Sequence, residues 1–308
     1  MMSAPEPPTV DHLAPESPCL TAKQAAAYLH LNEKKLYELA NSGEVPAARV
    51  GGKWLFPRRL LDDWLLEQAH GGVLTDRLLI AGGDDALLAA AVRSLAAELG
   101  AEAFVAYSPT ATLPGLEQLA RRRADLSVVH WGDVEHSAHL HATLLRAHPG
   151  HARWTLVRIG QREQGVLLRP GLGIDQLETL AAFDVRWAMR EAGSGASHFL
   201  ASALRARGLR AEDCSAVATA HGEREAAALL VRDAADCTPG TRATASEFGL
   251  DFLPLGREAL DLALPKEIYF RHLFQRLLAR LGSAEMRELA QQLGGYELAT
   301  PGQVLPLD

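Results

Sequence analysis

The sequence has 308 residues, of which 48% are hydrophobic and 22% charged, and its formal net charge is −7. This length predicts about two domains, and the apolar content is sufficient for hydrophobic cores. The acidic balance excludes a protein that coats nucleic acid along its whole length. No apolar run reaches the roughly 20 residues of a membrane-spanning helix, so we expect no membrane partner.

Residues 1–19 are rich in proline and acidic residues and lack the positive and apolar regions of a signal peptide. We therefore expect a disordered tail on a cytoplasmic protein. Cys19, Cys214 and Cys237 are scattered without a metal-binding spacing. This pattern fits a reducing compartment and predicts no metal site.

Residues 20–67 predict two short helices, a tight two-stranded hairpin and a third helix. Thr21 is suited to begin the first helix, with Gln24 as its capping-box partner, and Asn32 to begin the second. A glycine pair between two short apolar stretches predicts the hairpin turn. This order of elements is that of a compact winged helix-turn-helix.

The basic and aromatic residues of this segment are candidate contacts to double-stranded DNA: Lys34, Lys35, Tyr37, Arg49, Lys53 and Arg58. The first three share the outward side of the second helix, where side chains can reach base edges and phosphates in a major groove. The others lie at the hairpin and at the start of the third helix, where we expect phosphate contacts. The alternative is a small protein-interaction module whose lysines form a solvated face, but the agreement of turn, wing and core residues favours DNA.

Four short stretches carry a family resemblance: Lys35-Leu36-Tyr37, Gly43-Glu44-Val45-Pro46, Arg49-Val50-Gly51 and Trp54-Leu55-Phe56. Together they resemble the excisionase-type, MerR-like winged helix. The resemblance covers nearly the whole segment and implies a DNA-binding domain.

Residues 68–76 are polar and glycine-rich and predict a linker, after which residues 77–308 alternate between strand and helix patterns. We expect strands at 78–81, 103–107, 126–130, 155–159, 166–169, 185–189 and 215–218, and helices at 86–99, 113–122 and 198–207. This alternation predicts an α/β domain with mainly parallel sheets. Ligands of such domains gather where loops follow the carboxyl ends of strands.

One loop of this domain, residues 190–197, is suited to bind an anion. It follows a predicted strand and opens a helix, so its free N–H groups and the helix dipole favour negative charge. A second hydroxyl-rich loop, residues 108–112, also precedes a helix. Arg162 and Arg190 could each clamp an oxyanion or pair with a structural carboxylate such as Asp133, and other polar groups at strand ends could bind ligand or cap helices. The candidate ligand-binding residues are Asp85, Ser108, Thr110, His130, Arg162, Arg190, Ser194, Gly195, Ser197 and His221.

Several of these positions lie in motifs that carry a second resemblance: Asp85, His130-Trp131-Gly132-Asp133, Arg162 to Gly171, Arg190 to Gly195, Ala220-His221, Ala235-Asp236 and Gly249 to Leu255. They resemble the cytoplasmic periplasmic-binding-protein-like domain of the molybdate-binding type, which occurs fused to helix-turn-helix segments. The resemblance implies a type II fold of two lobes, the second at roughly residues 162–240, and molybdate or tungstate as effector.

Three positions depart from that family pattern. Met189, Ala196 and Ser197 stand where the family has Asn, Thr and Arg. The exchange removes a hydroxyl and a guanidinium that an oxyanion would use. Another small anion, or a degenerate pocket, is therefore the alternative to molybdate.

Two further patterns receive structural interpretations. Histidines at 136, 139, 141, 148 and 151 crowd one segment but match no metal signature, so we expect a solvated surface. Apolar residues from Phe270 to Leu281 recur at helical spacing and predict a core or dimer face.

The favoured function is that of a cytoplasmic transcription regulator, a homodimer in which a small anionic effector closes the two lobes and shifts the DNA-binding domains. The alternative is an intracellular binding or storage protein for an oxyanion or cofactor precursor, with an N-terminal domain that makes protein contacts. An enzyme using His130, Arg162, Ser194 and His221 ranks last, because no nucleophile elbow, metal set or nucleotide loop accompanies them. We therefore expect no enzymatic activity.

Overall fold

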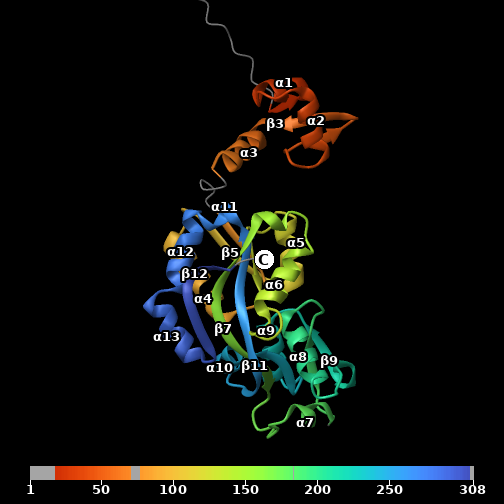
Figure 1. Ribbon diagram of the computed structural model, residues 1–308, viewed down its shortest axis with the longest axis vertical. Coiled ribbons are helices and arrows are strands. Elements are labelled where there is room, and N and C mark those ends of the chain that lie inside the picture. The colour runs from red at the N-terminus through yellow and green to blue at the C-terminus, as the bar shows by residue number, and fades with distance from the viewer. Residues whose placement is uncertain (1–17, 71–76, 183, 306–308) are drawn as a thin grey trace, which may run out of the picture. The chain divides into compact units, whose positions relative to one another are not determined.

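Contacts between Cα atoms divide the chain into two units, Met1–Leu74 and Thr75–Asp308, which we call the head and the sensor. The computed structural model describes residues 18–70, 77–182 and 184–305 (Figure 1). The tail expected before residue 18 and most of the expected linker lie outside these ranges.

The head is a winged helix-turn-helix, as expected. Its elements are β1 (Cys19–Thr21), α1 (Ala22–Tyr28), α2 (Glu33–Asn41), β2 (Ala48–Val50), β3 (Lys53–Pro57) and α3 (Arg58–His70). The three strands form one antiparallel sheet in the order β1-β3-β2. The helices and the sheet enclose a small core that includes the fully buried Leu36, Phe56 and Leu61.

The helix starts in the head follow the sequence expectation. Thr21 and Gln24 form a reciprocal capping box at the start of α1, and Asn32 accepts a hydrogen bond from the backbone N–H of Lys35 at the start of α2. The expectation was wrong at Cys19, which opens β1 instead of belonging to a tail. Pairing with β3 places β1 in the sheet, and this long-range contact left no local signal.

The sensor contains nine strands and supporting helices within its described residues. The strands are β4 (Arg77–Gly82), β5 (Phe104–Pro109), β6 (Leu126–Val129), β7 (Trp154–Leu168), β8 (Trp187–Arg190), β9 (Ala216–Ala220), β10 (Cys237–Thr241), β11 (Asp251–Pro265) and β12 (Tyr296–Leu305). The α-helices are α4 (Ala86–Leu99), α5 (Thr112–Ala120), α6 (Ser137–Arg146), α7 (Leu177–Ala182), α8 (Gly195–Arg205), α9 (Glu223–Val231), α10 (Arg242–Phe248), α11 (Lys266–Tyr269), α12 (His272–Leu281) and α13 (Ala284–Leu293), and 3-10 turns cover His151–Arg153 and Ala211–Asp213.

Two long antiparallel strands, β7 and β11, run through the whole sensor and join its two lobes (Figure 1). In the first lobe they are flanked by β5-β4-β6 and by β12, and in the second lobe by β10-β8-β9. The sequence predicted two strands at 155–159 and 166–169, but both belong to β7. The sheet is also mixed instead of mainly parallel, because β7 and β11 pair antiparallel with their neighbours.

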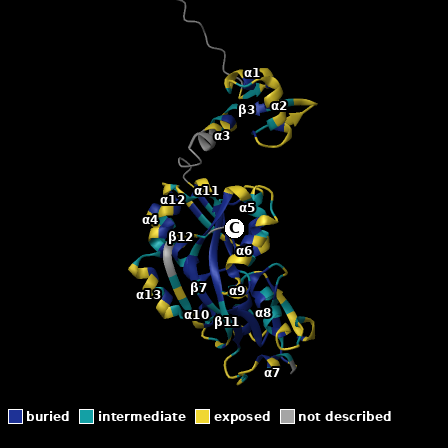
Figure 2. Ribbon diagram, in the orientation of Figure 1, coloured by how far each residue is buried: buried dark blue, intermediate teal, exposed yellow. Residues whose placement is uncertain are grey.

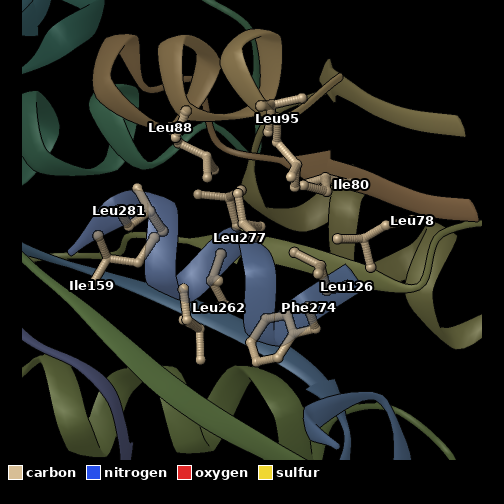
Figure 3. Packing of buried hydrophobic residues seen from close by; sticks show 14 of the residues in the cluster. Leu78, Ile80, Leu88, Leu95, Leu126, Ile159, Leu262, Phe274, Leu277 and Leu281 are labelled. Atoms are coloured by element: carbon tan, nitrogen blue, oxygen red, sulfur yellow. The ribbon is translucent and has the colours of Figure 1, made fainter. Parts of the chain in front are cut away.

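Each lobe has its own hydrophobic core. In the first lobe, Leu88 and Leu95 of α4 face Leu277 of α12 and Ile80 of β4 (Figure 3). The apolar repeat from Phe270 to Leu281 therefore serves the core, although Phe270 itself is exposed. Most of β7 and β11 is buried (Figure 2).

The histidine-rich segment is only partly the solvated surface that we expected. His136 and His139 are exposed, but His141 is fully buried and its Nδ1 lies 2.7 Å from Asp261 Oδ2. Arg158 forms a second ion pair with the same carboxylate. Burial of His141 depends on a partner 120 residues away, which the local sequence does not reveal.

Candidate functional site: a DNA-binding face and an interlobe site

The outer face of α2 presents the residues expected to read DNA. Lys34, Lys35 and Tyr37 are all exposed, while Leu36 and Ala40 on the opposite side are buried in the head core. Lys35 Nζ lies 3.5 Å from Glu38 on the same helix, and both side chains remain more than half exposed. Surface pairs of this kind contribute little to stability, so the lysine can exchange its partner for a phosphate.

The β2–β3 hairpin supplies the basic wing. Arg49 and Lys53 are exposed on either side of a turn whose two residues, Gly51 and Gly52, both have positive φ angles. This is the conformation that short hairpin turns require and that glycine adopts without strain. Both expected phosphate contacts therefore lie on an accessible hairpin.

Arg58 has a different environment from the other DNA-binding candidates. It is half-buried, and its guanidinium lies 5.2 Å from the centre of the Tyr28 ring. The Tyr28 hydroxyl in turn donates a hydrogen bond to Asp62 of α3. Arg58 therefore contributes to packing α1 against α3, in addition to the phosphate contact that the sequence suggested.

In the sensor, polar residues from both lobes converge where the lobes meet. We call this set the interlobe site: Asp84, Asp85, His130, Arg162, Arg190, Glu223 and Glu258. All seven are buried. The expected loops at the ends of β4, β6 and β8 contribute Asp84, His130 and the residues after Arg190.

Arg162 is the centre of this site. Its Nε donates to Glu258 Oε1 at 2.8 Å, and its Nη1 donates to Asp85 Oδ2 at 2.9 Å and to the carbonyl oxygen of Asp84 at 2.7 Å. Burial opposes the charge of Arg162, but Glu258 and Asp85 raise the pKa of its guanidinium. The arginine is therefore charged and fully engaged inside the protein.

His130 and Glu258 complete the first-lobe side. His130 Nδ1 lies 3.1 Å from Glu258 Oε2, and burial lowers the pKa of the imidazole, so the ring is neutral at pH 7. Burial alone would raise the pKa of Glu258, but its contacts with His130 and Arg162 outweigh burial and hold that pKa at about 2. Glu258 is a functional candidate that sequence reasoning missed, because no motif surrounds it.

Asp85 has a structural role in addition to its pairing with Arg162. Its Oδ1 accepts a hydrogen bond from Leu88 N and caps α4, and its Oδ2 accepts one from the Tyr296 hydroxyl. Of the residues that the sequence proposed as ligand contacts, Asp85 and Arg162 thus bind each other. They form the frame of the site.

Asp84 connects the two lobes directly. Its Oδ2 accepts a hydrogen bond of 2.8 Å from the backbone N–H of Glu223, the first residue of α9 in the second lobe. The Glu223 carboxylate in turn accepts a hydrogen bond from the backbone N–H of Thr241, at the start of α10. Neither acid was singled out from the sequence, although Asp84 lies in the glycine- and aspartate-rich turn after β4.

Arg190 ends β8 and is 7% exposed. Its guanidinium donates to two backbone carbonyl oxygens, those of Ala220 at 3.4 Å and His221 at 3.1 Å. Within the described part of the chain, no carboxylate lies within ion-pair distance of it. Arg190 is therefore the buried arginine whose positive charge is not matched by a direct partner.

The loop after Arg190 folds as the sequence indicated. Ser194 caps α8 by accepting a hydrogen bond from Ser197 N, and the Ser197 hydroxyl donates to Arg190 O at 2.7 Å. Gly195 packs directly on His130 of the other lobe. By contrast His221 is exposed, and its pKa is raised by a hydrogen bond with Glu191.

Ser108 and Thr110 are not brought to Arg190. They line a separate hollow of about 300 Å³ with residues of β4, β5 and α5. Thr110 Oγ1 accepts a hydrogen bond from Gly82 N and so supports the turn after β4. In the ranges that the structure describes, no group of three or more His, Cys, Asp or Glu residues could hold a metal ion, and no helix is long and apolar enough to cross a membrane.

Comparison with known proteins places both units in families. The profile of the PBP superfamily domain matches residues 93–282, more than half of the chain, and the profile of a helix-turn-helix domain matches residues 19–69. The chain thus belongs to the PBP superfamily and carries an N-terminal helix-turn-helix domain. These are binding families, for solutes and for DNA, and not enzyme families. No curated protein sequence matches the chain.

Two solved structures illustrate the fold. A candidate phosphate ABC transporter substrate-binding protein with bound phosphate, from Clostridium perfringens, has a TM-score of 0.55 and 8% identity, and the match covers 72% of this chain and 100% of that one. A hydrogen-peroxide-bound cysteine-to-serine mutant of Corynebacterium glutamicum OxyR has a TM-score of 0.52 and 14% identity, with 91% and 93% of the two chains covered. At these identities the likeness establishes the fold alone.

Replacing Gly195 by alanine should separate the two lobes locally. An added Cβ would lie 2.2 Å from His130 O and 2.3 Å from His130 Nδ1, so α8 must move away. Overpacking of this kind costs about 1–3 kcal/mol, which urea unfolding of the full chain should detect. Gly222→Ala is the control, since a Cβ there meets nothing closer than 3.6 Å, and a larger loss in that variant would contradict the assignment.

Proposed function

We propose that the protein is a transcription regulator that binds DNA through the head and a small anionic effector through the interlobe site. The observation that carries the proposal is the presence in one chain of an exposed basic helix and wing and of a two-lobed sensor. Arg190, buried without a carboxylate partner at the start of the α8 loop, supports the anionic character of the effector.

The anionic group of the effector is best served by Arg190 and the N-terminal turn of α8. That turn offers free N–H groups at Gly195 and Ala196 and a favourable helix dipole. Ser194 and Ser197 shape the loop, and Asp85, His130 and Arg162 hold the first-lobe wall. Phosphate, which the Clostridium perfringens protein binds, carboxylates, molybdate and tungstate all satisfy this chemistry, and we place them in one class.

Binding would act through the two strands shared by the lobes. Because β7 and β11 continue from one lobe into the other, a ligand that favours one arrangement of the lobes shifts the equilibrium between them. We infer that the regulator works as a homodimer on a two-fold symmetric operator, as most helix-turn-helix proteins of this kind do. Its site of action is the cytoplasm, where the DNA is.

The DNA assignment is tested by the double variant Lys35→Ala, Arg49→Ala. We expect operator affinity to fall by about tenfold or more, and the slope of log affinity against log salt to decrease by about 2, because two phosphate contacts are lost. Gel-shift titrations on an operator selected from random DNA give both quantities. The matched control is Arg121→Ala, Arg210→Ala, which changes the charge equally on the exposed surface of the sensor. Equal affinities for the two double variants would count against DNA binding by this face.

A further inference from the structure

The interlobe site contains more negative than positive charge. Four carboxylates are at least nine-tenths buried there, those of Asp84, Asp85, Glu223 and Glu258, against only the two arginines. Arg162 satisfies Asp85 and Glu258 through direct contacts. Asp84 and Glu223 remain without any ion-pair partner among the described residues.

Asp84 and Glu223 come from opposite lobes and lie close together. Asp84 accepts through Oδ2 from the backbone of Glu223, and Glu223 accepts through Oε1 from Thr241 N. Each carboxylate therefore keeps one oxygen without a hydrogen bond in the described part of the chain. Burial raises the pKa of Glu223, and the neighbouring charge of Asp84 adds to this effect. Two like charges held this way are unfavourable unless a proton or a cation joins them.

A buried amide near this pair provides an independent indication of a ligand. Gln164 is 1% exposed, yet neither its Nε2 nor its Oε1 has a hydrogen-bond partner. Residues two apart on a strand share a face, so Gln164 lies on the face of β7 that carries Arg162. It is also directly opposite Thr241, whose N–H binds Glu223. An unsatisfied buried amide is costly and is expected where a bound molecule completes the bonding.

We propose that the effector is amphoteric: its cationic amine lies between Asp84 and Glu223, while its anionic group binds Arg190. The inference rests on the proposed function and specifies the ligand class of the same site. A primary ammonium fits better than a metal ion, because these residues do not form a metal-binding group. The amine joins a first-lobe carboxylate to a second-lobe carboxylate and thereby favours the closed arrangement. The Gln164 amide supplies a neutral hydrogen-bonding partner beside the two charges.

The first test needs no knowledge of the ligand. Neutralising one member of an unfilled like-charged pair should stabilise the ligand-free protein, so Asp84→Asn and Glu223→Gln should each raise its Tm by about 2–4 °C. Both replacements keep an oxygen that can accept the backbone hydrogen bond. Glu247→Gln is the matched control, because this carboxylate has a direct partner in Arg224 and lies outside the site. A lower Tm in both site variants would show that the pair is a structural lock, and it would overturn the proposal.

The second test compares compounds that differ only in the amine. Calorimetric titrations of the full chain would use phosphoethanolamine against ethyl phosphate and L-alanine against L-lactate, with inorganic phosphate and molybdate as simple anions. We expect at least one amine-bearing compound to bind about tenfold or more tightly than its amine-free counterpart. Asp84→Asn and Glu223→Gln should abolish that preference, and Glu247→Gln should retain it.

The outcomes separate this inference from the proposed function. Binding of amine-free anions alone, abolished by Arg190→Ala, would retain an anion sensor and overturn the amphoteric effector. Amine-dependent binding without any selective DNA binding would support the ligand class and overturn the regulator. Absence of binding by every amine-bearing compound would count against the inference.

Discussion

Replacing Arg162 by methionine should lower the free energy of unfolding of the sensor by about 3–5 kcal/mol, because removal of one member of a buried ion pair leaves its partner uncompensated. Here the loss affects two carboxylates at once, since Arg162 contacts both Asp85 and Glu258. Urea unfolding followed by tryptophan fluorescence measures the change. Arg186→Met is the matched control: Arg186 also pairs with two carboxylates, Asp233 and Asp236, but its side chain is 38% exposed. Exposed pairs contribute about 0–1 kcal/mol, so similar losses in the two variants would contradict the account.

The deficit of Arg162→Met should depend on pH. The pKa of Glu258 is about 2 in the folded protein and 4.5 for the free group. A depressed folded pKa means that the stabilisation by this carboxylate is complete above pH 4.5 and is lost as pH falls towards 2. In the variant Glu258 can be buried as the neutral acid, which costs less at low pH. The difference between wild type and variant should therefore shrink between pH 7 and pH 3, and a deficit that grows on acidification would contradict this.

A second replacement separates the cost of a broken pair from the value of the pair itself. The double variant Arg162→Met, Glu258→Met removes the charge that the single variant leaves stranded. We expect it to recover part of the lost stability, as apolar replacements of buried ion pairs often do. Asp85 retains its contacts with Leu88 N and the Tyr296 hydroxyl, so recovery should be incomplete.

Local sequence signals predicted those elements whose ends and faces are fixed by neighbouring residues. The helix expected at 86–99 has the same bounds in the structure, because Asp85 caps its start and Gly100 ends it. Thr21 and Gln24 form the expected capping box for the same local reason. The loop at 190–197 also folds as expected, since Ser194 can cap α8 without help from distant residues.

Signals failed where a distant strand or charge decides the outcome. The polar run around Arg162 and Gln164 resembles a break between two strands, yet it is the middle of β7, because β11 pairs along its whole length. The polarity that hid the strand belongs to the interlobe site. Asp85 and Arg162 were expected to await a ligand, but they meet each other across 77 positions of sequence. Buried pairing of this kind can be recognised only after the fold is known.

Replacing Phe56 by alanine should unfold the head and leave the sensor intact. Phe56 is fully buried among residues from both helices of the helix-turn-helix and from α3, and it lies opposite Leu20 in the sheet. Loss of a buried phenylalanine costs about 3–5 kcal/mol, and a domain of this size has little stability to spare. DNA affinity should therefore be lost.

Calorimetry of the full chain can locate that loss. Since the head and the sensor have separate cores, the low-enthalpy transition of the head should disappear in Phe56→Ala while the Tm of the sensor stays within about 1 °C of wild type. Leu60→Ala, on a side chain that is 49% exposed, should change neither. Retention of operator affinity by Phe56→Ala would mean that this core does not hold the Lys34–Tyr37 surface in place. A fall in the Tm of the sensor would instead mean that the two units share stability, and effector binding could then reach the DNA-binding face through packing as well as through the relative placement of paired heads.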